Sequence, residues 1–247
     1  MKSFLGIDGC PSGWLTVKIT EDDSVTLSIY DTIGSVWTDN YDAELILIDI
    51  PIGLPESGNG TRECDAEARK VLKPYRTSSV FPVPCRKALY VDNYKKASAI
   101  NKKLTGKSFS KQSWMISPKI REVDTFLLSN PDAKGKMREI HPEVLFWALN
   151  GGRAMEHNKH TEAGFAERVA VIEKHNSDYA DILKGVKRID LNITLASRLK
   201  YSRDDIVDAF AAALTARLSE GNLKSFPESP PRDGEVLPME MVYWENR

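Results

Sequence analysis

Two aspartates stand where a buried carboxylate can do chemistry. Asp8 closes the apolar segment 3–8 and precedes a glycine, and Asp49 lies near the end of the apolar run 44–50. A carboxylate at the end of a buried strand is costly unless it is paired or bound to a metal. If the two strands are parallel neighbours, the carboxylates repel each other unless a divalent cation lies between them. The alternative is that each aspartate only caps the turn that follows.

A second acidic pair lies in the segment 202–213. Asp205 and Asp208 are three residues apart and therefore share one face of a helix. Small side chains at Ala209, Ala212 and Ala213 favour close packing of this helix on a sheet, which would bring the carboxylates to the sheet edge. The alternative is that acidic residues in a first helical turn only stabilise the helix dipole.

The elements that would position these aspartates can be predicted from the hydrophobic pattern. Segments 13–20 and 24–30 alternate apolar and polar residues and predict a hairpin after the strand 3–8. A short helix is expected at 31–41, and the continuous apolar run 44–50 is typical of a central strand covered on both faces. A right-handed crossover would place this strand beside the first.

The rest of the chain is expected to be mainly helical. Helices are expected at 62–73, 92–104, 117–129, 142–149, 161–175, 178–200 and 203–220, and strands at 137–141 and 235–244. Lys119 would then lie at a helix N-terminus, where anions are favoured.

Length and composition suit one α/β domain, 1–247, containing an insertion. Apolar residues make up 41% and charged residues 28% of 247 residues, which is typical of a globular protein. No apolar run approaches the roughly 20 residues of a membrane span. The cysteines Cys10, Cys64 and Cys85 form no disulfide or metal-binding pattern, so we expect a cytoplasmic protein without membrane association.

Charge is unevenly distributed. Residues 61–121 contain 15 Lys and Arg against 4 Asp and Glu, whereas residues 1–60 contain 2 against 10. A basic surface beside an acidic site suits binding of a polyanion. The alternative is that the lysines only solvate exposed helices. These lysines are Lys95, Lys96, Lys102, Lys103, Lys107 and Lys111.

Six segments resemble a widespread uncharacterised bacterial and archaeal family, described as predicted nucleases of the ribonuclease H-like superfamily. The segments are Gly-Ile-Asp-Gly-Cys-Pro-Ser-Gly-Trp (6–14), Ile-Asp-Ile-Pro-Ile-Gly-Leu-Pro (48–55), 78–88, 112–124, Glu-Ile-His-Pro-Glu-Val-Leu-Phe (139–146) and Asp-Asp-Ile-Val-Asp-Ala (204–209). The resemblance runs from residue 3 to about 220. It implies an α/β ribonuclease H-like fold: a mixed five-stranded sheet, with a three-stranded antiparallel meander plus parallel strands, flanked by helices. A basic, mainly helical insertion is expected at about 60–135.

The resemblance implies a metal site. The Asp-x-x-Asp-Ala ending is similar to the last helix of Holliday-junction resolvases. The resemblance places Asp8 on the first strand, Asp49 on the fourth strand, and Asp205 with Asp208 on the final helix. It implies that these four residues bind two Mg²⁺ or Mn²⁺ ions. Resolvases usually have Glu where this chain has Asp49, whose side chain is one methylene shorter.

A second polar group lies in the family-like segment at 139–146. Glu139 is a further candidate ligand, and His141 and Glu143 are candidates for proton transfer near neutral pH. The alternative is that His141 and Glu143 cap the helix that begins at Pro142.

Arg62, Arg69, Arg86 and Lys119 are candidates for substrate binding. Arginine binds phosphate through two parallel hydrogen bonds. Intramolecular ion pairs with the acidic core are the alternative.

The sequence therefore predicts a metal-dependent nuclease that hydrolyses phosphodiester bonds of DNA or RNA by a two-metal mechanism. Two other classes stay open. One is a non-catalytic nucleic-acid- or protein-binding module. The other is an ATP-dependent phosphotransferase related to actin and sugar kinases. The oligomeric state is also open.

Overall fold

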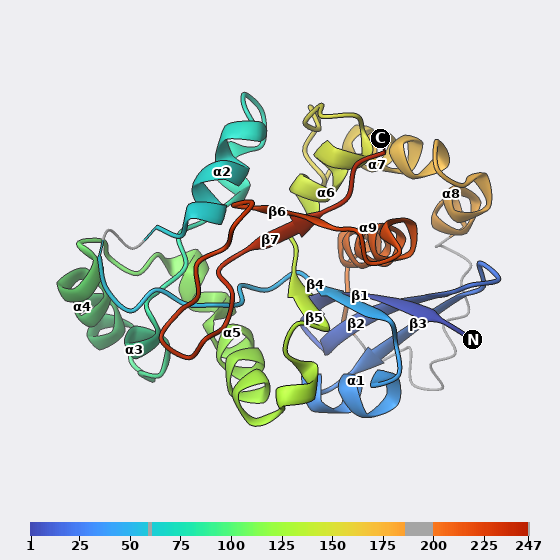
Figure 1. Ribbon diagram of the computed structural model, residues 1–247. Helices are drawn as coiled ribbons and strands as arrows, with labels where there is room; N and C mark the ends of the chain where they lie inside the picture. Colours follow the sequence, from blue (N-terminus) through green and yellow to red (C-terminus); the bar gives the residue numbers. More distant parts are fainter. Residues whose placement is uncertain (59–60, 186–199, 247) are drawn as a thin grey trace.

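The computed structural model describes residues 1–58, 61–185 and 200–246, and its centre is a mixed five-stranded sheet (Figure 1). The strand order is β3-β2-β1-β4-β5. The strands are β1 (Ser3–Cys10), β2 (Gly13–Thr20), β3 (Val25–Tyr30), β4 (Leu45–Ile48) and β5 (Met137–Glu139). The first three form an antiparallel meander, and β4 and β5 continue parallel to β1. The predicted hairpin and the predicted neighbours β1 and β4 are confirmed.

Helices supply most of the remaining structure. They are α1 (Ile33–Asn40), α2 (Glu63–Val71), α3 (Arg86–Leu89), α4 (Tyr94–Thr105), α5 (Lys111–Ser129), α6 (Pro142–Leu149), α7 (Glu162–Glu173), α8 (Ser177–Lys184) and α9 (Arg203–Ser219). Short 3₁₀ helices occur at η1 (Thr77–Ser79) and η2 (Pro131–Ala133). The helix expected at 178–200 agrees with α8 at its start, and residues 186–199 lie outside the described residues.

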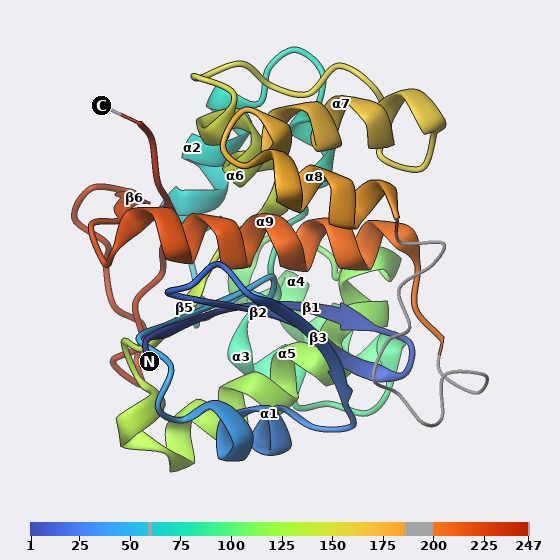
Figure 2. The same ribbon diagram turned by 90° about the vertical axis from the view of Figure 1, so that its right-hand side faces the viewer.

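Helices cover both faces of the sheet. Figure 2 shows α9 along one face and α1 with α5 against the other. The α9 side packs Leu15, Val17 and Leu47 of the sheet with the apolar residues of α6 to α9, and the opposite side packs Ile7 and Ile48 with α1 and α5. Both faces of β1 and β4 are therefore buried, as their uninterrupted apolar sequences predict.

Helix α9 lies unusually close to β1. A Cβ atom on Gly6 would stand 2.0 Å from the carbonyl oxygen of Ala209 and 2.3 Å from the amide nitrogen of Ala213. Only glycine on the strand and small residues on the helix allow this approach. The packing predicted from the alanines of this helix is confirmed.

Helix α5 begins earlier than the sequence predicts. Ser110 is its N-cap, and the Ser110 hydroxyl accepts the Ser113 amide at 2.9 Å. Pro118 lies inside the helix. There it leaves the Trp114 carbonyl without an amide donor, and the Ser117 hydroxyl donates to that carbonyl at 2.7 Å. The predicted start at 117 was wrong, and Lys119 is in the middle of the helix.

The C-terminal segment forms a separate small sheet. β6 (Lys224–Phe226) pairs antiparallel with β7 (Met241–Tyr243). The strand predicted at 235–244 is therefore shorter than expected and does not belong to the central sheet.

Helices α2 to α5 all lie between β4 and β5 in the chain (Figure 1). In the described part of the chain, no helix is long and apolar enough to cross a membrane.

Candidate active site

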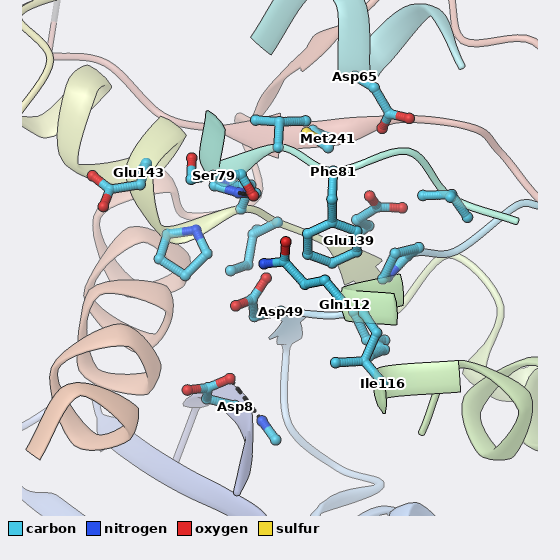
Figure 3. Close-up of a pocket in the computed structure, with 18 of the residues that line it drawn as sticks. Asp8, Asp49, Asp65, Ser79, Phe81, Gln112, Ile116, Glu139, Glu143 and Met241 are labelled. Carbon is cyan, nitrogen blue, oxygen red and sulfur yellow. Dashed lines mark hydrogen bonds between the residues drawn. The ribbon is translucent and has the colours of Figure 1, made fainter. Parts of the chain in front are cut away.

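Three of the predicted aspartates meet at one end of the central strands. β1 and β4 are in register through Ile7 and Ile48, so Asp8 and Asp49 follow on neighbouring strands. The Asp49 amide donates to the Ile7 carbonyl at 2.9 Å, which extends this register. Asp208 of α9 is 1% exposed and Asp8 is 8% exposed. Figure 3 shows Asp8 and Asp49 on the same side of a cavity.

The charges of this acidic cluster, Asp8, Asp49 and Asp208, are mutually unfavourable. Burial, followed by the charges of Asp49 and Asp208, raises the pKa of Asp8 well above its ordinary value. Burial and then Asp208 raise the pKa of Asp49 to about 8. Proximity of like charges in a desolvated site has this effect. A cation bound here would relieve both the repulsion and the desolvation.

Lys159 is an internal cation at this site. Its Nζ donates to Oδ2 of Asp208 at 2.6 Å, while Oδ1 of Asp208 is buried with no hydrogen-bond partner among the described residues. Burial lowers the pKa of Lys159, but the charges of Asp208, Asp8 and Asp49 and the hydrogen bond to Asp208 together outweigh it and leave the pKa above its ordinary value. Lys159 could not be identified from the sequence, because it lies in the loop between α6 and α7, within no recognisable pattern.

Asp205 is placed differently from the other three. Its carboxylate accepts the Ser202 amide at 2.7 Å, and the Ser202 hydroxyl accepts the Asp205 amide at 3.2 Å. This reciprocal pair is a capping box at the start of α9. Asp205 is near enough to contribute to the raised pKa of Asp8. One of its oxygens nevertheless accepts the capping hydrogen bond, which agrees with the alternative that Asp205 stabilises the start of the helix.

Glu139 is a buried structural partner rather than a free ligand. Its two oxygens accept hydrogen bonds from both terminal nitrogens of Arg62 at 2.6 Å, and one also accepts the Ile52 amide at 2.6 Å. Arg62 also pairs with Asp65 at 2.8 Å and its side chain is fully buried. The predicted roles of Glu139 as a metal ligand and Arg62 as a phosphate contact are not supported by this geometry. Arg62 instead forms ion pairs within the protein, which was the alternative to phosphate binding.

His141 and Glu143 have different hydrogen-bond partners, since Nε2 of His141 lies 3.4 Å from the Ser79 carbonyl and Glu143 contacts Arg168. Burial lowers the pKa of His141 to about 4, which does not favour the predicted role as a proton carrier near neutral pH. Glu143 accepts a hydrogen bond from Arg168 at 2.6 Å, and Figure 3 shows its carboxylate directed away from Asp49. Neither side chain forms a capping hydrogen bond with α6.

The other predicted phosphate-binding residues are also engaged within the protein. Arg86 pairs with Asp124 at 2.9 Å and with Asp233 at 2.6 Å. Arg69 donates to the Val80 carbonyl at 2.9 Å. Lys119 donates to the Gly13 carbonyl at 2.6 Å and also lines the cavity. These residues hold loops in place, and only Lys119 stands beside the acidic cluster.

A cavity of about 440 Å³ opens beside the cluster (Figure 3). Asp8 and Asp49 line it together with the segment 78–83, the first turns of α5 and residues 158–160. This size is within the range of pockets that bind small ligands. In the part of the chain that the structure describes, no three His, Cys, Asp or Glu side chains are already arranged as a metal-binding group.

Fold and site together define an α/β protein whose central parallel strands bring two aspartates to the wall of a cavity. The chain belongs to the family described as protein of unknown function DUF429, whose model matches residues 6–232. No curated protein and no solved structure matches the chain. The predicted membership of an uncharacterised family is confirmed.

Proposed function

We propose that this protein is a metal-dependent hydrolase that cleaves phosphodiester bonds of nucleic acid, on a ribonuclease H-like fold. The observation that carries the proposal is a cavity large enough for a small ligand that Asp8 and Asp49 line, with Asp208 near enough to raise the pKa of both. Perturbed ionisable groups beside a cavity are candidates for function, because a fold maintains such unfavourable charges only against a stability cost.

The topology supports this fold assignment. An antiparallel meander is followed by a helix and then by strands parallel to the first, and a late helix packs on the sheet beside β1. This is the element order expected of a ribonuclease H-like protein. It also accounts for the separation of the three aspartates in the sequence, since β1, β4 and α9 each deliver one.

The acidic cluster fits a hard divalent cation. Asp8, Asp49 and Asp208 would hold Mg²⁺ or Mn²⁺, because carboxylate oxygens are the ligands these ions prefer. Oδ1 of Asp208, buried with no partner among the described residues, is an oxygen available for such a bond. A bound ion would lower the pKa of a water and stabilise negative charge on a phosphate. Asp205 and Glu139 are less suited, because capping and Arg62 already engage their oxygens.

The first test uses Asp8→Asn, which preserves shape and removes one charge. Mn²⁺ is expected to stabilise the parent by about 2.7 kcal/mol at a hundredfold excess over its dissociation constant. The variant should lose this gain and also the cleavage of a panel of DNA and RNA substrates. Without metal it should be at least as stable as the parent, because the repulsion with Asp49 and Asp208 is reduced. The measurements are melting curves with and without Mn²⁺, and gel assays of cleavage.

The opposite pattern would contradict the proposal. If Asp8 only caps the turn at Gly9, whose amide it accepts at 2.7 Å, the substitution should cost about 0.5–2 kcal/mol with or without Mn²⁺. Retention of parental cleavage by Asp8→Asn would likewise rule out its role.

Lys159 permits a second test of the metal site. A cation that binds Asp208 must compete with Lys159, so Lys159→Met should bind Mn²⁺ more tightly than the parent and show a larger metal-dependent rise in melting temperature. Lys184→Met is the matched control, because Lys184 is 47% exposed and pairs with Glu173. An equal response of both variants and the parent would mean that Mn²⁺ binds elsewhere.

The same ion pair favours one second candidate, a nucleic-acid-binding module without catalysis. Lys159 already neutralises Asp208 without any metal. On this hypothesis Mn²⁺ leaves the melting temperature of the parent unchanged, and nucleic acid binds but is not cleaved.

A further inference from the structure

Phe81 places an aromatic ring in a cavity that has both polar and apolar lining residues. Its ring extends from the segment 80–84 into the cavity, on the same side as Asp49 (Figure 3). Phe81 is half-buried, yet it belongs to none of the three hydrophobic clusters that the described residues form. A large apolar side chain gains most of its stability from such clusters, so this ring is free to pack against something else.

The segment that carries Phe81 is well anchored. Val80 and Val83 on either side are buried, and Pro82 and Pro84 restrict the backbone between and after them. The Pro82 carbonyl also accepts a hydrogen bond from the Ser113 hydroxyl at 2.8 Å. A ring on a fixed backbone loses little conformational entropy when a ligand stacks on it.

Gln112 supplies the hydrogen-bonding group beside this ring. It lies in the first turn of α5, is exposed, and its side chain extends into the cavity past the Phe81 ring towards Asp49 (Figure 3). Among the described residues its amide has no hydrogen-bond partner. An amide both donates and accepts, which suits the edge of a nucleobase.

We propose that the cavity accepts one unpaired nucleotide, with the base stacked on Phe81, its edge hydrogen-bonded to Gln112, and its phosphate beside Asp49 and Lys159. The proposal rests on the proposed function and names its substrate as single-stranded nucleic acid or an unpaired nucleotide of a longer strand. A base inside a duplex is stacked on both faces and must leave the helix before it can enter a cavity. Aromatic side chains bind unpaired bases of any sequence by stacking.

The test measures binding to a fluorescein-labelled oligo(dT) decamer, to a blunt DNA duplex of equal length, and to dTMP, in buffer with Ca²⁺. The parent should bind the decamer more tightly than the duplex. Phe81→Ala should weaken decamer binding by roughly 5-fold to 150-fold, the effect of about 1–3 kcal/mol per stacked base. Phe81→Trp should bind the decamer with the affinity of the parent. Tyr41→Ala is the control, because Tyr41 is 64% exposed and does not line the cavity.

Two further measurements separate stacking from folding. A decamer with one 2-aminopurine should lose fluorescence on binding the parent and not Phe81→Ala. Gln112→Ala, at an exposed position, should keep the parental melting temperature while weakening the binding of the decamer. If dTMP binds and responds to Phe81→Ala as strongly as the decamer does, the ligand is a free nucleotide rather than a strand, which overturns the assigned substrate.

The outcomes distinguish this inference from the proposed function. If the parent cleaves or binds nucleic acid but Phe81→Ala and Tyr41→Ala behave alike, the nucleotide pocket is wrong and the hydrolase proposal stands. Tighter binding to the blunt duplex than to the decamer also overturns the pocket. If the parent neither binds nor cleaves any substrate, both fail.

Discussion

Ionisable side chains around the cavity fall into two groups. Arg62 with Glu139, and Arg168 with Glu143, are buried pairs in which each charge has a direct counter-charge. Among the described residues, Asp8 and Asp49 form no ion pair, and the charge of Asp208 raises the pKa of both. Paired groups hold elements together, and removing one partner of a buried pair typically costs several kcal/mol. The unpaired carboxylates instead mark the site where a ligand would supply the missing charge.

His141 makes a prediction about pH. Burial lowers its pKa to about 4, against about 6.5 in an unfolded chain. Between these values the unfolded state binds more protons, so this histidine contributes stability above pH 6.5 that is lost as the pH falls toward 4. His141→Gln should therefore show a smaller loss of stability between pH 7.5 and pH 5 than the parent, in urea unfolding at both pH values.

The control for this experiment is His157→Gln, since His157 is exposed on the loop before α7. Its loss of stability between the two pH values should match that of the parent. An identical loss in His141→Gln would mean that other groups cause the acid sensitivity.

At the scale of elements, the contact between β1 and α9 positions the acidic cluster. Asp8 and Asp208 come from these two elements, which approach so closely that Gly6 has no room for a side chain. Any change in the separation of β1 and α9 changes the distance between the two carboxylates. Gly6 is thus a positioning residue although it carries no chemical group.

Gly6→Ala tests this packing. Its Cβ would overlap backbone atoms of Ala209 and Ala213, which cannot move without shifting α9. We expect a loss at or above the upper end of the roughly 1–3 kcal/mol usual for overpacked cores. Gly34→Ala in α1 is the matched control, because the new Cβ meets only the Thr32 hydroxyl at 3.8 Å and should raise stability by up to about 1 kcal/mol. Chemical denaturation measures both, and equal stabilities would disprove the tight contact.

These elements also show what a sequence can predict. β1, β4 and α9 were predictable because burial on both faces or a run of alanines leaves a local pattern, and their order determines which carboxylates meet. The bidentate pair of Arg62 and Glu139, 77 residues apart, leaves no such pattern. Neither does the pair of Lys159 and Asp208, because a long-range ion pair depends on tertiary structure alone. The early start of α5 could not be predicted, because a proline usually interrupts a helix. Here the Ser117 hydroxyl replaces the hydrogen bond to the Trp114 carbonyl that Pro118 cannot donate.

On the scale of the whole molecule, opposite charges are separated. The acidic cluster lies at the sheet, and the helices between β4 and β5 carry exposed lysines. The pair of Arg62 and Glu139 joins these two parts, because Arg62 precedes α2 and Glu139 ends β5. On α4, Lys95, Lys96, Lys102 and Lys103 are exposed and form no ion pair with any described residue. We expect these lysines, rather than Arg62, Arg69 and Arg86, which are engaged within the protein, to contact a nucleic-acid backbone.

The last prediction concerns these four lysines of α4. Each lysine that neutralises a phosphate of a single strand contributes about 0.7 to the slope of log affinity against log salt, because it releases condensed counterions. Changing all four to Gln should therefore reduce the slope for an oligo(dT) strand by up to roughly 3. A matched variant changes four exposed lysines elsewhere, Lys2, Lys174, Lys184 and Lys224, and alters the net charge equally. Fluorescence anisotropy at several salt concentrations measures both slopes. A loss confined to the α4 variant locates the backbone contact on this helix, whereas equal losses in the two variants would show that only the total charge of the protein matters.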